Sequence, residues 1–246
     1  MAVSAQFTRE EVVSLFQQRR PTALRGLHSS RHSNRYVDVH ASAGDPSSST
    51  TKRAMDVLIA SMALVFLMPL LIGISIAIKA TSPGPVFFKQ RRYGLRNRQF
   101  QIYKFRTMDV ETGDQSGVRQ TTSNDPRVTP IGRFLRRTSL DELPQLLNVV
   151  IGDMSIVGPR PHVPGMQAGA RLYEDLVPYY FHRHTVRPGI TGLAQVSGCR
   201  GSTVNRDSAM DRIDYDLQYI ETWPIWLDIK IIAKTARQEF LSGNGF

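Results

Sequence analysis

The sequence predicts an α+β fold: a mainly helical domain with a small β-hairpin, anchored by an apolar helix–break–helix. Three observations support this prediction. An apolar run carries a proline near its centre, two strand-like segments ("VFFKQRRYG" and "QFQIYKFRTM") flank the turn signal "GLRN", and apolar-rich stretches typical of helices follow. The chain therefore divides into a tail at 1–50, an apolar segment at 51–80 and a folded domain at 81–246.

The composition favours an anionic partner. The 246 residues include 31 Lys and Arg against 21 Asp and Glu, a formal net charge of +10. Such a surplus suits nucleic acid, an acidic membrane surface or a phosphorylated small molecule. The single cysteine, Cys199, excludes an internal disulfide and fits a reducing compartment.

Most of the tail, residues 1–50, is expected to be disordered. It contains "HSSRHSNR" and "GDPSSSTT" and has little apolar surface to bury. "EEVVSLFQQ" within it predicts a short helix. The tail does not read as a signal peptide, because it lacks an early apolar core.

The apolar run from Ala54 to Ile78 predicts a re-entrant membrane segment. A straight helix of roughly 25 residues would span about 37 Å, enough for a bilayer core of about 30 Å. However, Pro69 near its centre predicts a break. Positive charge, which marks the cytoplasmic side, occurs at both ends, in Lys52, Arg53, Lys79, Lys89, Arg91 and Arg92. A helix that enters and leaves by the cytoplasmic face satisfies both observations; a spanning helix and a buried core helix are the alternatives.

The second predicted strand carries paired cations. Alternation along "QFQIYKFRTM" puts Lys104 and Arg106 on one face, with Tyr103 and Phe105 on the other. Side by side on a rigid element, the two cations suit an anionic ligand. A solvated face is the ordinary alternative.

An adjacent acid pair precedes the next apolar-rich stretch, "LPQLLNVVIG", which predicts a helix ended by Gly152. Ser139-x-x-Glu142 matches a capping box, in which the acids only stabilise a helix start. Pro144 argues against a start at Ser139, because its missing N–H would fall beyond the first four positions. If the helix starts at Asp141 or later, both carboxylates lie at its mouth, beside Arg133, Arg136 and Arg137. That arrangement suits phosphate handling.

Two later loops combine stiffness with positive charge. "VGPRPHVPG" (157–165) holds Arg160 between prolines, which suits a preorganised guanidinium. "YYFHRHTVRPGITGLAQVSGCRG" (179–201) is basic and glycine-rich. Its His182-x-His184 spacing allows a metal site, but no cysteine or acid lies nearby in the sequence, and phosphate contact fits better.

The closing stretch "RIDYDLQYIETWPIWLDIKIIAKTARQEF" predicts two helices broken at Pro224. The second has a broad apolar face, with Trp226 at its start and Lys230 on its polar side. A helix in the membrane interface and ordinary core packing both fit this pattern.

Taken in order, these motifs resemble those of the bacterial sugar transferases that begin exopolysaccharide or O-antigen assembly. These are the monotopic phosphoglycosyl transferases, or polyprenyl-phosphate hexose-1-phosphate transferases. The resemblance runs from about Lys52 to the C-terminus and rests on "KRAMD", "SPGPVFFKQRRYG", "YKFRTM", "DPRVTPIGRFLRRTSLDELPQLLNV", "GDMSIVGPRP", "VRPGITGLAQVSG" and "YDLQYI…W…WLDIKII". Each motif alone is weak, but the ordered set is specific. The short chain resembles the minimal members of the family.

The resemblance implies a catalytic domain on the cytoplasmic face of the bacterial inner membrane, with both ends of the re-entrant helix cytoplasmic. It implies transfer of a hexose-1-phosphate, galactose or glucose, from a UDP-sugar to undecaprenyl phosphate, with release of UMP. An N-acetylated sugar is the alternative donor. The oligomeric state, including a homodimer, stays open.

The resemblance also implies roles for single residues. Asp141 and Glu142 match the family's acidic dyad, with Asp141 as nucleophile and as contact for Mg²⁺. Glu142 either orients Asp141 or handles protons. The substrate-binding cations are expected to be Lys104, Arg136 and Arg160, together with Arg106.

One position departs from the family pattern. Many relatives have Ser-Pro at the membrane break, and this chain has Met68-Pro69. The break is expected to persist, with a less firmly set angle.

Two other functions are alternatives to the transferase: a membrane-anchored nucleic-acid-binding protein, and a catalytically silent membrane scaffold. Nucleic acid is not expected as a partner, because the cations cluster beside acids and stiff loops.

Overall fold

A computed structural model describes residues 45–110, 125–168, 171–200 and 206–242 of the chain. Nearly all of the tail at 1–50, including the short helix expected at "EEVVSLFQQ", lies outside these ranges.

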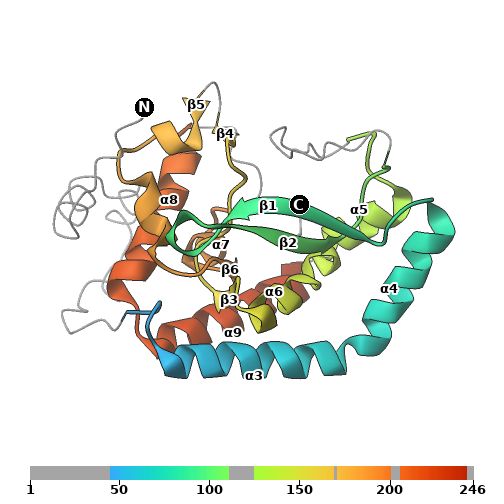
Figure 1. Cartoon of the computed structure of the whole chain (residues 1–246), viewed down its shortest axis with the longest axis horizontal. Coiled ribbons are helices and arrows are strands. Elements are labelled where there is room, and N and C mark those ends of the chain that lie inside the picture. The colour runs from blue at the N-terminus through green and yellow to red at the C-terminus, as the bar shows by residue number, and fades with distance from the viewer. Residues whose placement is uncertain (1–44, 111–124, 169–170, 201–205, 243–246) are drawn as a thin grey trace.

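Helices and short strands are mixed along the chain, which confirms the α+β prediction (Figure 1). In order, the elements are α3 (Thr50–Phe66), α4 (Met68–Thr81), β1 (Phe87–Tyr93), η3 (Leu95–Asn97), β2 (Gln99–Phe105), α5 (Pro130–Arg137), η4 (Leu140–Glu142), α6 (Gln145–Ile151), β3 (Ser155–Val157), β4 (Gln167–Ala168), β5 (Arg171–Leu172), η5 (Tyr173–Asp175), η6 (Tyr180–Thr185), β6 (Gly189–Thr191), α7 (Leu193–Val196), α8 (Arg206–Thr222) and α9 (Ile225–Ser242).

The apolar run forms two helices with a break between them. The Ser49 hydroxyl caps the start of α3 by accepting a hydrogen bond from the Lys52 amide. The break falls at Leu67, and Pro69 is the second residue of α4, where its missing N–H has no helical partner to lose. Within the described ranges, no helix by itself is both long and apolar enough to cross a bilayer. In that part of the chain, α3 and α4 together are the one pair that meets the test, and they are bent by 62°.

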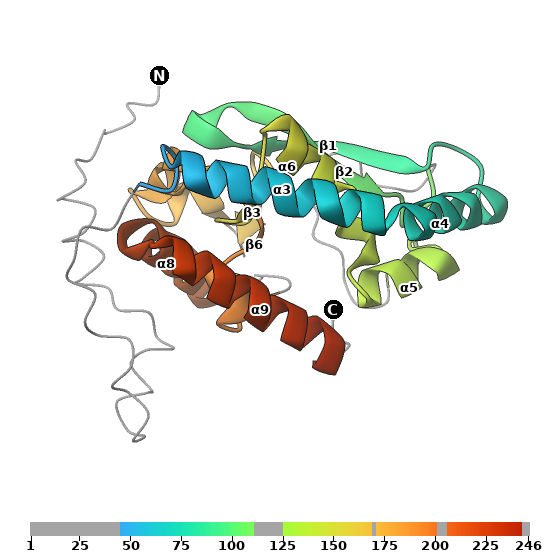
Figure 2. The same ribbon diagram turned by 90° about the horizontal axis from the view of Figure 1, so that it is seen from below.

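The helix α3 runs along the base of the molecule, and α4 turns up from its end toward α5 (Figure 1). Seen from below, α6 lies on one side of α3 and α9 on the other (Figure 2). The large core cluster includes Ala60 of α3, Val149 of α6 and Ile231 of α9. The first half of the apolar run is therefore packed against the domain.

The predicted hairpin is confirmed. Strands β1 and β2 pair antiparallel, with Lys89 opposite Tyr103. The turn between them contains Arg96 and Asn97 at φ 53° and 61°, a left-handed pair that reverses the chain.

Strands β3 and β6 pair in parallel, and β3 leads into the proline-rich loop at 157–165. They approach so closely that a Cβ added to Gly189 would lie 2.1 Å from the Gly158 nitrogen. Both glycines are therefore required by packing.

The two C-terminal helices form as predicted, on either side of Pro224. One side of α9 is buried through Ile231, and the other exposes Trp226 and Ile229. The Lys230 ammonium lies 3.9 Å from the centroid of the Trp226 ring. Core packing thus explains one face of this helix only.

Candidate active site

The acid pair lies on a single 3-10 turn, η4, between α5 and α6. Ser139 before the turn is left-handed (φ 55°), and its side chain makes no capping bond, so the capping-box alternative is wrong. The regular helix α6 starts only at Gln145, after Pro144, and ends at Gly152 (φ 109°) as expected. A helix start beyond Asp141, the second alternative, is confirmed.

The Glu142 carboxylate is fully engaged by two cations. The Lys104 ammonium donates to Oε1 at 2.7 Å, and the Arg160 guanidinium donates to Oε1 at 2.6 Å and to Oε2 at 3.3 Å. Burial alone would raise the pKa of Glu142, but the charges and hydrogen bonds of Arg160 and Lys104 outweigh it and hold that pKa well below its ordinary value. Glu142 therefore stays ionised and holds the two cations in place.

The Asp141 carboxylate is in the opposite situation. It is 8% exposed, and within the described ranges only burial and nearby charges, with no hydrogen-bond donor, act on it. Burial raises the pKa of Asp141 to about 6, the negative charge of Glu142 adds to this, and the positive charge of Lys104 opposes it. A buried carboxylate whose lone pairs are not taken up by described donors is available to a ligand or an electrophile.

Arg136 is the third cation beside the pair. It lies in the last turn of α5, and its Nε donates to the Thr107 hydroxyl at 2.8 Å. Burial lowers the pKa of Arg136, while the charge of Asp141 raises it, which reflects the nearness of the two groups. Lys104, Arg136 and Arg160 thus come together around the acids from β2, α5 and the loop after β3.

Arg106 is directed elsewhere. Its Nη2 donates to the Ser82 carbonyl and hydroxyl oxygens at 2.8 and 2.7 Å, and its Nη1 donates to the Pro83 carbonyl at 2.5 Å. Strand β2 ends at Phe105, so the alternation that predicted a shared face with Lys104 no longer applies. A Cβ on Gly84 (φ 113°) would meet the Arg106 Nη1 at 2.2 Å. In this structure Arg106 fastens the turn that leaves α4.

The loop at 157–165 is held by its backbone. Three consecutive carbonyl oxygens, those of Arg160, Pro161 and His162, each accept a hydrogen bond, from Arg183 Nη2 at 2.8 Å, Arg92 Nη1 at 3.2 Å and the Tyr93 amide at 3.0 Å respectively. Buried Asp216 pairs with Arg183. Sequence reasoning missed this support, because Arg92 and Asp216 belong to no pattern that points at the loop.

The His-x-His pair does not converge. The His184 Nδ1 lies 2.6 Å from the Asn97 Oδ1, whereas the His182 Nε2 lies 3.6 Å from a carboxylate oxygen of Glu221. Within the described ranges no three His, Cys, Asp or Glu side chains gather as a group that could hold a metal ion.

Comparison with known proteins gives one consistent family. The family model described as "Bacterial sugar transferase" matches residues 47–242. The chain is 51% identical to the "Exopolysaccharide production protein PSS" of Rhizobium leguminosarum bv. phaseoli over 79% of its own length and 98% of that protein.

Two larger relatives carry names that state a reaction. The chain is 51% identical to an "Undecaprenyl-phosphate glucose phosphotransferase" of Komagataeibacter xylinus, over 79% of this chain and 37% of that protein. It is 48% identical to a "UDP-glucose:undecaprenyl-phosphate glucose-1-phosphate transferase" of Escherichia coli (strain K12), over 78% of this chain and 40% of that protein. The matched region is thus well under half of these two relatives. With a family model matched over most of its length, the chain belongs to the bacterial sugar transferase family.

Proposed function

We propose that the chain transfers a hexose-1-phosphate from a UDP-sugar to undecaprenyl phosphate and releases UMP, as the first membrane step of exopolysaccharide or O-antigen synthesis. Membership of the sugar transferase family and the names of the relatives support the reaction class. Glucose is the first donor to test, because several relatives are named for it; galactose and N-acetylated sugars follow, since one relative is named for N-acetylgalactosamine.

The unequal state of the two carboxylates carries the proposal. Glu142 holds Lys104 and Arg160, whereas Asp141, its neighbour in sequence, is open. One carboxylate thus positions cations and the other is left to react. Environments that push neighbouring pKa values apart are a mark of catalytic pairs.

In the first step an Asp141 oxygen attacks the phosphorus that carries the sugar. The bond between that phosphorus and the oxygen bridging to UMP breaks, and UMP leaves with the electron pair. The hexose phosphate is then bound covalently to Asp141 as an acyl phosphate. This divides one difficult displacement into two.

In the second step a phosphate oxygen of undecaprenyl phosphate attacks the same phosphorus. The bond to Asp141 breaks, its carboxylate is regenerated, and the product is the undecaprenyl diphosphate-linked hexose. Lys104, Arg136 and Arg160 offset the charge of the diphosphate in both steps. Contact of Arg106 with substrate stays a prediction, because its guanidinium is held at Ser82 and Pro83.

A Mg²⁺ ion fits this donor set in one way. Mg²⁺ commonly uses one or two carboxylates together with substrate phosphates. Both oxygens of Glu142 accept hydrogen bonds from cations, so Asp141 is the carboxylate that would hold the ion. When bound, the ion would neutralise diphosphate charge.

Glu142 is better suited to orientation than to proton transfer. Its pKa is held well below the ordinary value, so it would remain a carboxylate across the working pH range. We therefore assign it to holding Lys104 and Arg160 in place for the donor.

The bent pair α3 and α4 would enter the inner membrane from the cytoplasmic face and return to it. Exposure of apolar side chains is greatest at the elbow: Val65 is 74% and Phe66 is 83% exposed. Apolar surface exposed at the tip of a bent helix pair suits lipid.

The reaction is tested with full-length protein in detergent, Mg²⁺, undecaprenyl phosphate and a panel of UDP-sugars, by identifying the released nucleotide. UMP that depends on lipid phosphate and on Asp141 is expected. UDP instead would mean that the sugar moves without its phosphate, and the mechanism would be wrong.

Membrane topology is tested by tags or single cysteines at the two ends, reacted in intact cells and in inverted vesicles. Both ends are expected to react only from the cytoplasmic side. A periplasmic N-terminus would show that the segment spans the membrane. Replacing Pro69→Ala in the same tagged proteins is expected to move a fraction of the N-termini across.

A further inference from the structure

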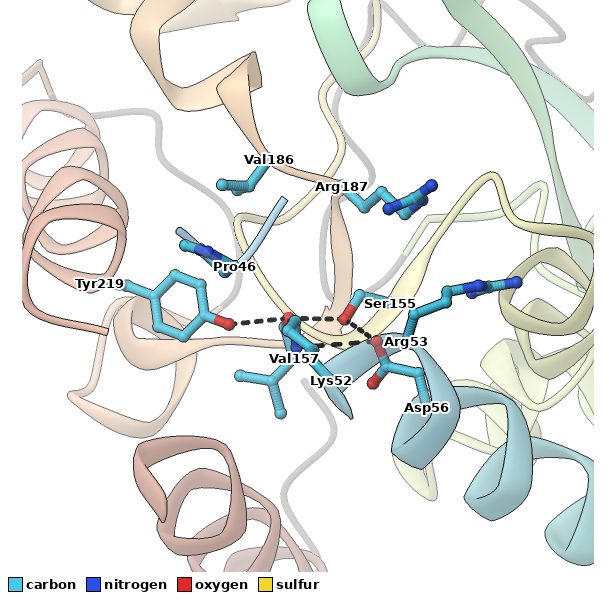
Figure 3. Close-up of a pocket in the computed structure, with 9 residues that line it drawn as sticks. All are labelled: Pro46, Lys52, Arg53, Asp56, Ser155, Val157, Val186, Arg187 and Tyr219. Atoms are coloured by element: carbon cyan, nitrogen blue, oxygen red, sulfur yellow. Dashed lines mark hydrogen bonds and ion pairs between the residues drawn. The ribbon is translucent and has the colours of Figure 1, made fainter. Parts of the chain in front are cut away.

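The "KRAMD" motif ahead of the apolar run places two charged side chains where burial is costly. Lys52 and Asp56, one turn apart on α3, are 5% and 1% exposed. Their side chains point toward Ser155 and Val157 of β3 (Figure 3). A helix that served only as an anchor could bury apolar residues here at lower cost.

These two side chains bond to every residue of β3. The Ile156 amide donates to the Asp56 Oδ1 at 3.1 Å, and the Ser155 hydroxyl donates to the Asp56 Oδ2 at 2.6 Å. The Lys52 ammonium donates to the Val157 carbonyl at 3.1 Å. The position of β3 is therefore set by side chains of the membrane-proximal helix.

The charge of Lys52 is balanced by a carboxylate of α9. The Asp228 carboxylate of α9 lies 2.6 Å from the ammonium, and Asp228 also accepts hydrogen bonds from the Tyr219 hydroxyl at 2.9 Å and the Trp223 indole at 3.1 Å. These hydrogen bonds are directional, so they determine how α3 is placed along β3 and α9 as well as that it contacts them.

Backbone hydrogen bonds hold the two residues that connect strand β3 to Arg160. The Gly158 amide donates to the Thr191 carbonyl and the Gly189 amide donates to the Pro159 carbonyl, both at 2.9 Å. The Arg160 carbonyl accepts from Arg183. A shift at β3 would therefore be carried to the guanidinium that holds Glu142.

We propose that Lys52 and Asp56 are positioning residues for Arg160, so that the seating of the re-entrant helix on the domain sets the geometry of the active site. The inference rests on the proposed function, in which Arg160 offsets the charge of the donor diphosphate. It goes further by giving the anchor a role in the reaction itself.

A double-mutant cycle tests the proposal. UMP release is measured for full-length Asp56→Ala in the wild-type background and in an Arg160→Ala background. If Asp56 acts through Arg160, kcat/KM falls about tenfold in the first background and less than twofold in the second. Equal loss in both backgrounds, or no loss in the first, would overturn the proposal.

Two further variants keep the cycle decisive. Ser155→Ala removes one contact to Asp56 and leaves the charges in place, so it supports the same comparison between backgrounds if Asp56→Ala fails to accumulate in membranes. Ile231→Val, buried on α9, is the matched control and is expected to act equally in both backgrounds. A wild-type protein that releases no UMP would refute the proposed function and this inference together, whereas an active wild type with additive losses refutes the inference alone.

Discussion

Two clusters of this protein each combine a lysine with two carboxylates and differ in how completely those carboxylates are hydrogen-bonded. One joins Lys52 to Asp56 and Asp228, and the other joins Lys104 to Glu142 with Asp141 beside it. In the first cluster both carboxylates accept short hydrogen bonds from described groups. In the second, only Glu142 does.

The difference suits the first cluster to positioning and, under the proposed function, the second to reaction. A carboxylate with all its partners is fixed and inert, so it is suited to hold a helix against a strand. A carboxylate left buried and open is costly to keep ionised, and that cost is lowered when it binds a metal ion or bonds to phosphorus.

The largest expected effect is the loss of activity when Asp141, the open carboxylate, is replaced. Asp141→Asn should lower UMP release by about a thousandfold or more, because the amide is a poor nucleophile. The measurement is turnover with the preferred UDP-sugar, with Asp175→Asn, on an exposed turn, as the control. Wild-type-like turnover in Asp141→Asn would show that Asp141 is not the nucleophile.

Substitution in the cluster of Lys52, Asp56 and Asp228 should lower the free energy of unfolding. Asp228→Asn removes the nearer anionic partner of the buried Lys52 and leaves it, within the described ranges, with the Val157 carbonyl at 3.1 Å and the Asp56 carboxylate at 3.7 Å. We expect a loss of about 3 kcal/mol in the free energy of unfolding. Denaturant unfolding in detergent measures it. An unchanged midpoint would show that Asp228 contributes little to the fold.

Glu142→Gln should have an intermediate effect on activity. The amide keeps the shape but releases Lys104 and Arg160 from charge-assisted bonds, so kcat/KM should fall roughly 10- to 100-fold and leave a measurable remnant. Steady-state kinetics across donor concentrations would separate binding from turnover. A loss as complete as that of Asp141→Asn would instead indicate a direct chemical role.

The pH profile should report the open carboxylate. Because the pKa of Asp141 is raised to about 6, the ionised form of this proposed nucleophile is lost as pH falls, and kcat/KM should drop about tenfold per pH unit below pH 6. A profile that stays flat down to pH 4.5 would mean that Asp141 ionises normally.

The smallest effect is a gain in stability. The pKa of Asp141 is higher in the folded state (about 6) than the ordinary value of 3.8, so the folded state binds the proton more tightly and loses stability as pH rises between these values. The difference between these values corresponds to about 3 kcal/mol, and burial of the amide N–H groups of asparagine offsets part of it. Asp141→Asn should therefore be more stable than wild type at pH 7.5, by about 1–2 kcal/mol, and should lose this advantage near pH 4. Thermal melts at the two pH values measure it, and a destabilised variant at pH 7.5 would contradict this expectation.

The sequence alone determined the elements whose causes are local. Proline positions predicted the breaks at Leu67 and before α9, alternation with the "GLRN" turn predicted the hairpin, and glycine predicted the end of α6. Adjacency also determined that Asp141 and Glu142 would share one turn.

Only the tertiary structure decided which charges meet. Lys104 and Glu142 are 38 residues apart, and Lys52 and Asp228 are 176 apart, so neither pairing follows from a local pattern. Arg106 also has a partner that no local pattern predicted. Strand β2 ends one residue earlier, at Phe105, and the Arg106 guanidinium donates a hydrogen bond to the Ser82 carbonyl. Local propensities depend on neighbours in the chain, whereas the partner of a buried charge depends on which distant segments pack around it. For that reason the sequence indicated the acid pair but not which of its two carboxylates the cations bind.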